Sequence, residues 1–171
     1  MSTNPITKVV FTPLPQYDII KEWEHPDFNA RYGIERKVRK EDSRMVNHVL
    51  DCFPEGYRRL VDIKVQPLEL EHTTCQPGWH CDTTMDPDAV HHLFVLGENR
   101  TEFLIDGEAV RIPEGHFASY GSTVQHRGPV VTVPETRVLI RTTESAMVAG
   151  NSIFEDEYKF RYPIGGEHVR I

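Results

Sequence analysis

Regular alternation of apolar and polar residues is the feature that most constrains how this chain can fold. From Leu60 to Val65 apolar residues tend to occupy every second position, the period of a β-strand, and Pro67 is expected to break this strand at a bulge or sheet edge. Further stretches have strand composition, and Gly, Pro, Asn or Asp separate most of them. They are Val90–Leu96, Thr101–Ile105, Glu108–Ile112, His116–Tyr120, Val130–Val133 and Thr136–Thr143. Short strands with turn signals about every 8–12 residues predict a sandwich or a barrel.

The segment before this strand-rich region has a different pattern. Residues 1–35 are punctuated by proline and predict one short strand, Lys8–Phe11, followed by irregular chain. From about Lys40 to Phe53 the apolar residues fall on one face of a helix, which Pro54 ends. We therefore expect one helix ahead of a body made of strands.

Length and composition limit the class of protein. A chain of 171 residues suits one domain, with an N-terminal flanking segment and helix (1–60), a β core (61–145) and a C-terminal extension (146–171). The 19 basic and 26 acidic residues give a net charge of −7, which disfavours binding to phosphate backbones. The chain shows no signal-peptide pattern and no apolar run long enough for a membrane span, and its cysteines number three. These features predict a cytoplasmic protein in a reducing compartment.

Three residues from two separate stretches have the chemistry and spacing of a metal site. His80 and Asp82 fall between two predicted strands. Residues i and i+2 of an extended chain point the same way, so this imidazole and this carboxylate can meet at one point. His126, much later in the chain, can supply a third donor. Two histidines and one carboxylate leave positions open on the metal, as in non-haem Fe(II) oxygenases, whereas a closed four-ligand zinc site does not.

Two arginines follow His126 on one predicted strand. Arg137 and Arg141 share strand parity, so both point inward if either does. A buried arginine is costly unless an anion pairs with it, and its two-pronged head group matches a carboxylate. A cosubstrate with a carboxylate remote from the metal would find a binding partner on this strand.

His80-x-Asp82, the later His126 and then Arg137 together resemble the pattern of the Fe(II)/2-oxoglutarate-dependent oxygenase superfamily. The resemblance covers residues from about 68 to 143. It implies a double-stranded β-helix, a jelly-roll or cupin-like barrel, with one or two flanking N-terminal helices. It also implies that the two histidines and the aspartate hold Fe(II), and that Arg137 binds the 5-carboxylate of 2-oxoglutarate.

Within the superfamily the chain is most similar to the aspartyl/asparaginyl and amino-acid hydroxylase-like branch. The strand that begins at His92 carries this similarity, which implies that His92 contacts 2-oxoglutarate. Arg141 is a second candidate anion-binding residue, for 2-oxoglutarate in place of Arg137 or for a substrate carboxylate beside it. His91 has the opposite parity, and we expect it to be structural or exposed.

The implied activity is hydroxylation by O₂ of an amino acid, a peptidyl side chain or another small polar molecule, with release of succinate and CO₂. We expect a monomer or homodimer with neither nucleic acid nor membrane as partner. The main alternative is a cupin-type metal protein, such as an isomerase, a cosubstrate-independent dioxygenase or a sensor, because Gly107, Pro113 and Gly115 match the opening of a second cupin motif. A metal-free binding module and a DNA or RNA demethylase are further alternatives, and the acidic charge argues against the demethylase.

Overall fold

The computed structural model describes residues 8–27, 29–32, 43–54, 59–74, 78–82, 86–145, 153–154, 160–163 and 169–170. Within these residues the helices are α1 (Tyr17–Ile20) and α2 (Arg44–Cys52). The strands are β1 (Val10–Pro13), β2 (Ala30–Tyr32), β3 (Arg59–Leu68), β4 (His72–Thr73), β5 (Val90–Leu96), β6 (Glu102–Ile105), β7 (Glu108–Arg111), β8 (His116–Gly121), β9 (His126–Arg127), β10 (Glu135–Glu144), β11 (Ile153–Phe154), β12 (Phe160–Pro163) and β13 (Val169–Arg170).

Most strands belong to one large sheet. Its strand order is β1-β8-β5-β10-β3-β2-β11, and two smaller sheets have the orders β7-β6-β9 and β13-β12-β4. All of these strand pairs are antiparallel. Over the described residues each sheet is open and has two end strands. The fold is thus mainly β, as the sequence predicts, with two N-terminal helices where the residue pattern predicts one, because α1 lies in the stretch expected to be irregular.

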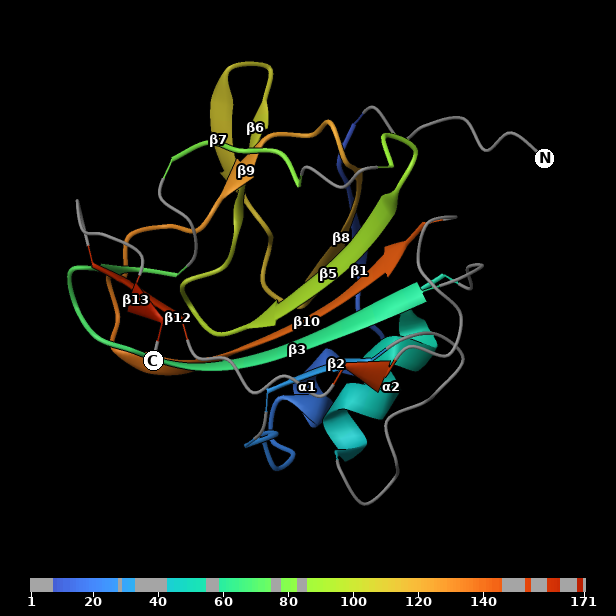
Figure 1. Ribbon diagram of the computed structural model, residues 1–171. Coiled ribbons are helices and arrows are strands. Elements are labelled where there is room, and N and C mark those ends of the chain that lie inside the picture. Colours follow the sequence, from blue (N-terminus) through green and yellow to red (C-terminus); the bar gives the residue numbers. More distant parts are fainter. Residues whose placement is uncertain are drawn as a thin grey trace.

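The large sheet is covered on both faces. Figure 1 shows α1 and α2 against one face, and the β6–β7 hairpin with β9 over the other. One buried cluster joins the helices to the sheet, and its members include Met45, Val46, Val49, Phe94, Leu96, Val138 and Ile140. A second cluster joins the sheet to the hairpin, and its members include Leu93, Val95, Phe103, Ile112, Ala118 and Tyr120. Even-numbered residues of β5 and β10 therefore face the helices, and odd-numbered residues face the smaller sheet.

Helix α2 has a clear start and a clear buried face. The Ser43 hydroxyl oxygen accepts a hydrogen bond from the Val46 N–H at 3.1 Å, which caps the N-terminus. Met45, Val46 and Val49 are fully buried against the sheet. The helix ends before Phe53, where Pro54 follows. The predicted helix is confirmed from Arg44 onward, and its expected start at Lys40 lies outside the described residues.

Strand β3 corrects one expectation. It runs without a break from Arg59 to Leu68, so the predicted interruption at Pro67 is wrong. Pro67 lies opposite Thr136 of β10, whereas β2 pairs with β3 only at Val61–Ile63. In the described chain this end of β3 is a sheet edge, which is one of the two alternatives expected for Pro67 and a place where a residue without an N–H is tolerated.

The other predicted strands are present, with one exception. Val130–Val133 is not a strand, and only Val130 makes an isolated bridge, to Thr73. The remaining strands begin and end within two residues of the predicted positions. None of the helices in the described ranges is long and apolar enough to cross a membrane.

Candidate metal centre

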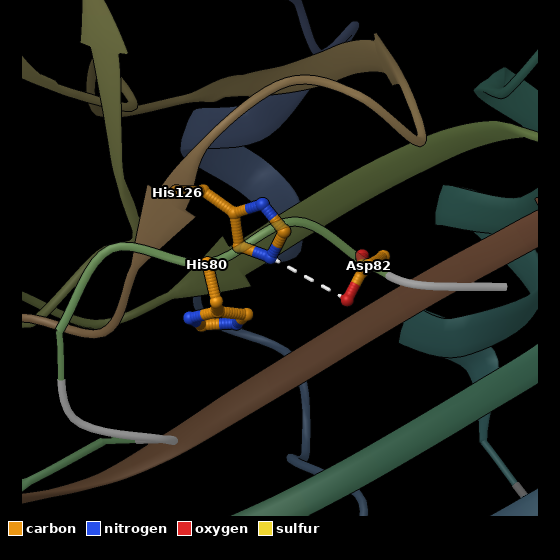
Figure 2. A group of neighbouring side chains, drawn as sticks. All are labelled: His80, Asp82 and His126. Atoms are coloured by element: carbon orange, nitrogen blue, oxygen red, sulfur yellow. Dashed lines mark ion pairs between the residues drawn. The ribbon is translucent and has the colours of Figure 1, made fainter. Parts of the chain in front are cut away.

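His80, Asp82 and His126 lie together in the structure. Each offers one ligand atom, and these atoms all lie within 4.8 Å of one another. His126 Nε2 is 3.5 Å from Asp82 Oδ1, and the ring centroids of His80 and His126 are 4.5 Å apart. Figure 2 shows the cluster, with the ion pair between His126 and Asp82 dashed. It is the only such group of three or more His, Cys, Asp or Glu side chains among the residues that the structure describes.

Backbone pairing brings the two histidines together. The His80 N–H donates to the His126 carbonyl oxygen at 3.0 Å, and the His126 N–H donates to the His80 carbonyl oxygen at 2.8 Å. Two residues that exchange both hydrogen bonds lie directly opposite one another in an antiparallel pair, so their side chains share a face. Asp82 follows His80 by two residues, the spacing that returns a side chain to the same face of extended chain.

Hydrogen bonds set the tautomer of each histidine. His80 Nδ1 lies 3.1 Å from the Gly78 carbonyl oxygen, and His126 Nδ1 lies 3.2 Å from the Val124 carbonyl oxygen. A carbonyl oxygen only accepts, so each Nδ1 carries the hydrogen and each Nε2 keeps a lone pair in the neutral ring. Metal-binding histidines are commonly oriented in this way.

The environment of His80 also favours its neutral form. Burial lowers the pKa of His80, although the hydrogen bond to the Gly78 carbonyl opposes this. Neutral imidazole is the form that binds a metal. The two imidazoles and the carboxylate therefore fit a divalent transition metal.

Asp82 is held by side chains of the large sheet. Its Oδ2 accepts hydrogen bonds from Arg141 Nη1 at 3.0 Å and from the Tyr120 hydroxyl at 3.1 Å. Burial alone would raise the pKa of Asp82. Arg141 and His126 lower this pKa by more and hold it well below its usual range. Burial and the neighbouring Asp82 charge raise the pKa of Tyr120 well above its usual value. The site thus contains an ionised carboxylate whose Oδ1 is the atom nearer His126.

Arg141 connects Asp82 to a second carboxylate. Its Nη2 and Nε lie 2.9 and 3.3 Å from Oδ2 of Asp62, which is fully buried. Asp62 is the residue of β3 directly opposite Arg141 of β10. Burial lowers the pKa of Arg141, but the two aspartates raise it well above its usual value. Arg141 is therefore a charged bridge between two aspartates.

Arg137 lies on the same face of β10, farther along the strand. Its side chain is 1% exposed. Nη1 donates to Gln66 Oε1 at 2.8 Å, and Nη2 donates to Thr101 Oγ1 at 3.0 Å. Four residues of strand separate it from Arg141, which corresponds to about 13 Å. The expected shared orientation of the two arginines is thus present.

His92 is not brought to this cluster. Its Nδ1 lies 2.7 Å from Ser119 Oγ, and its ring centroid is 5.9 Å from that of Phe53, the residue after α2. His92 therefore faces the helices, on the opposite side of the sheet from Asp82. The expectation that His92 contacts 2-oxoglutarate does not agree with this placement.

The neighbouring His91 faces the cluster instead. Its Nε2 lies 4.0 Å from Asp82 Oδ2, its ring stacks on Tyr120 at 5.0 Å, and Nδ1 lies 2.9 Å from Thr143 Oγ1. Burial lowers the pKa of His91 to about 4, despite the opposing Asp82 charge, so the ring is neutral. Of the two alternatives that the sequence leaves for His91, structural or exposed, its 1% exposure excludes the second.

A second contact reinforces the strand pair that carries the histidines. Trp79 precedes His80 and Arg127 follows His126, and the Arg127 guanidinium carbon lies 4.3 Å from the centroid of the Trp79 ring. Arg127 Nε also donates to Glu102 Oε2 at 2.9 Å. These contacts fasten the two ligand-bearing segments to each other and to β6.

Sequence reasoning missed Tyr120 and Asp62. Asp62 belongs to the polar set of β3, while the apolar Val61 and Ile63 pack in the cluster beneath the helices. The polar face of this strand therefore lines the interior beside the site. That two-sided pattern was the available signal for Asp62. Tyr120 gave none because β8 is buried on both faces, with Ser119 and Tyr120 both buried on opposite sides.

Comparisons with known proteins add no assignment. No family model matches the chain, and no curated protein or solved structure does. Function is therefore inferred from the side chains of the site.

Proposed function

We propose that the protein is an Fe(II)- and 2-oxoglutarate-dependent oxygenase in which His80, Asp82 and His126 hold the iron. The observation that supports it most is the convergence of two imidazoles and one ionised carboxylate. Both imidazoles have Nδ1 bonded to a backbone carbonyl, which leaves both Nε2 atoms for a metal. This donor set is typical of non-haem Fe(II) enzymes, which keep coordination positions for a cosubstrate and O₂.

A finer fold assignment belongs to the same proposal. We take the large sheet and the β7-β6-β9 sheet as the two sheets of a double-stranded β-helix. The buried cluster that contains Leu93 and Phe103 lies between them. The ligands fit this arrangement because His126 belongs to the smaller sheet, while Tyr120 and Arg141, which hold Asp82, belong to the larger one.

Arg137 is our candidate for the remote carboxylate of 2-oxoglutarate. The charge of Arg141 is already matched by Asp62 and Asp82, so an anion there would displace existing ion pairs. Arg137 lies on the same face of the large sheet as the site, and Gln66 and Thr101 hold its guanidinium group in a fixed orientation. Pre-organisation of this kind lowers the cost of binding a carboxylate. His92 has no part in this proposal.

The residues of the chain have separate tasks in the proposed reaction. Bound iron would supply activation of O₂ for the hydroxylation of a C–H bond, while 2-oxoglutarate is oxidised to succinate and CO₂. Tyr120 and Arg141 orient the carboxylate of Asp82. The apolar cluster around Phe103 excludes water from the inner side of the site. The substrate class we propose is an amino acid, a peptidyl side chain or another small polar molecule.

The cupin alternative has less support. Cupin sites commonly add a glutamate to histidine ligands, and no glutamate joins the three ligands in the described part of the chain. Asp82 also takes the place of the second histidine in the usual His-x-His pair.

The test is an anaerobic titration of the Fe(II)-loaded chain with 2-oxoglutarate. Chelation of a 2-oxo acid to Fe(II) gives a visible charge-transfer band, so the expected result is a saturable band in wild type and none in Asp82→Ala. Asp88→Ala is the matched control, because Asp88 is exposed and outside the ligand set. On admission of O₂, wild type and the control should release succinate. A wild-type chain that binds iron without this band would contradict the oxygenase proposal and favour the cupin alternative.

A further inference from the structure

Arg141 pairs with both Asp62 and Asp82, so its positive charge lies directly beside a candidate metal ligand. We propose that Arg141 is a built-in cation that limits how tightly the site holds a divalent metal and keeps Asp62 out of the ligand set. This inference rests on the proposed metal site at His80, Asp82 and His126.

The contacts place two carboxylates around one guanidinium. Arg141 Nη1 is 3.0 Å from Asp82 Oδ2, and Nη2 is 2.9 Å from Asp62 Oδ2. Asp62 is fully buried and only 19% of the Arg141 side chain is exposed, so little water lies between these charges. Without the guanidinium, two ionised carboxylates would face one interior space, which is the arrangement that attracts divalent cations.

The charge of Arg141 acts against a metal at Asp82. The guanidinium is always protonated, so a fixed positive charge sits directly beside a ligand carboxylate. Like charges in a partly buried site repel more strongly than in water, because the effective dielectric constant is lower. Arg141 therefore weakens metal binding, although it also orients the carboxylate.

Arg141 also controls the number of protein ligands. Its two contacts with Asp62 hold that carboxylate on the β3 side of the guanidinium. A released Asp62 would be a fourth protein ligand and would close one position of the metal. The ion pair thus preserves the open coordination that a cosubstrate needs.

The direction in which a substitution changes the metal affinity distinguishes this role from simple support of a ligand. A residue that only supports a ligand weakens metal binding when it is removed, by about 10- to 100-fold in known sites. A competing cation does the opposite. Tyr120 donates to the same Oδ2 without a charge, so it shows the effect of support alone.

The experiment measures the dissociation constant of Mn(II) for the metal-free full chain, from the electron paramagnetic resonance signal of unbound Mn(II). Arg141→Gln should bind Mn(II) roughly tenfold more tightly or better, because one positive charge is lost and a second carboxylate is freed. Arg141→Lys keeps the charge and should stay within about threefold of wild type. Water-proton relaxivity should show fewer exchangeable waters on Mn(II) in the Gln variant. Weaker or unchanged binding by Arg141→Gln, or equal behaviour of the Lys and Gln variants, would overturn the inference.

A charge-compensation series keeps the test decisive if Arg141→Gln does not fold. Asp62→Asn removes a negative charge without touching a ligand, so it should weaken Mn(II) binding by roughly tenfold. The Asp62→Asn/Arg141→Gln double variant restores the net charge and should return toward wild type. Unchanged or tighter binding by Asp62→Asn contradicts the inference on its own.

The failure of this inference differs from the failure of the proposed function. If wild type binds Mn(II) through His126 and Arg141→Gln binds it no more tightly, the inference is wrong and the metal site stands. If the tighter binding is observed but Fe(II) and 2-oxoglutarate give no charge-transfer band, the inference stands and the oxygenase assignment is wrong.

Discussion

Arg141 of β10 donates to Asp82 at 3.0 Å, across a separation of 59 residues in the chain. Asp82 lies in the segment 78–82, outside every strand, whereas Arg141 is in the middle of the large sheet. The large sheet therefore holds a carboxylate that comes from outside its own strands. Three neighbouring strands take part, because Tyr120 comes from β8, His91 from β5 and Arg141 from β10.

Removal of the Tyr120 hydroxyl tests this support. Tyr120→Phe keeps the buried ring, so the chain should fold, but Asp82 loses one of the two donors that hold Oδ2. We expect the affinity for Mn(II) to fall by about tenfold. Tyr17→Phe is the matched control, because its hydroxyl also donates to a carboxylate at 3.1 Å, that of Glu114, outside the ligand cluster. Equal affinities in the two variants would contradict a positioning role for Tyr120.

The two adjacent histidines of β5 should behave differently because they lie on opposite faces. His91→Ala removes a ring beside Asp82 and Tyr120, and we expect Mn(II) affinity to fall by about tenfold. His92→Ala removes a buried hydrogen bond to Ser119, so the free energy of unfolding should fall by about 1–3 kcal/mol while Mn(II) affinity stays unchanged. Chemical denaturation and metal titration measure the two effects. If His92→Ala lost metal affinity while His91→Ala kept it, the site would lie on the helix face of the sheet, which contradicts our placement.

Arg137 should affect the cosubstrate and not the metal. Arg137→Lys loses the planar fork that Gln66 and Thr101 orient, so 2-oxoglutarate should bind to the Fe(II)-loaded chain about tenfold more weakly. Arg100→Lys is a control, since Arg100 is a partly buried arginine that donates to the backbone carbonyls of Gly97 and Ile112. Titration of the charge-transfer band gives both affinities. If Arg137→Lys binds 2-oxoglutarate as wild type does, Arg137 is not its carboxylate partner.

The packing of α2 is predicted to stabilise the fold without touching the site. Met45→Ala leaves a cavity among fully buried residues on the helix face of the sheet, so the free energy of unfolding should fall by about 2–5 kcal/mol. The metal ligands lie on the other face, and Mn(II) affinity of the folded variant should equal that of wild type. A large change in affinity would show that the two faces are coupled.

Local patterns predicted most of the strands and the convergence of the three candidate ligands. The period of two identified β3, strand composition bounded by turn residues identified β5 and β10, and the parity of His80 and Asp82 placed both on one side. Parity could not say which of His91 and His92 faces the site, because β5 is buried on both faces and both residues are at most 4% exposed.

Long-range register explains what local patterns missed. Asp62 meets Arg141 only because β3 pairs with β10 in one register, across 79 residues of sequence. Pro67 suggested a broken strand because its missing N–H weakens a ladder, yet β3 has no β2 partner at that position in the described chain. Strand pairing and register depend on which strands become neighbours, and the sequence of a single strand does not specify them.

The location of a metal in a crystal tests the central claim most directly. Anomalous difference density from crystals of the full chain grown with Mn(II) should show one ion between His80 Nε2, His126 Nε2 and Asp82 Oδ1, at metal–ligand distances of about 2.0–2.3 Å. Density elsewhere, or no density between these three atoms in crystals saturated with Mn(II), would contradict the account.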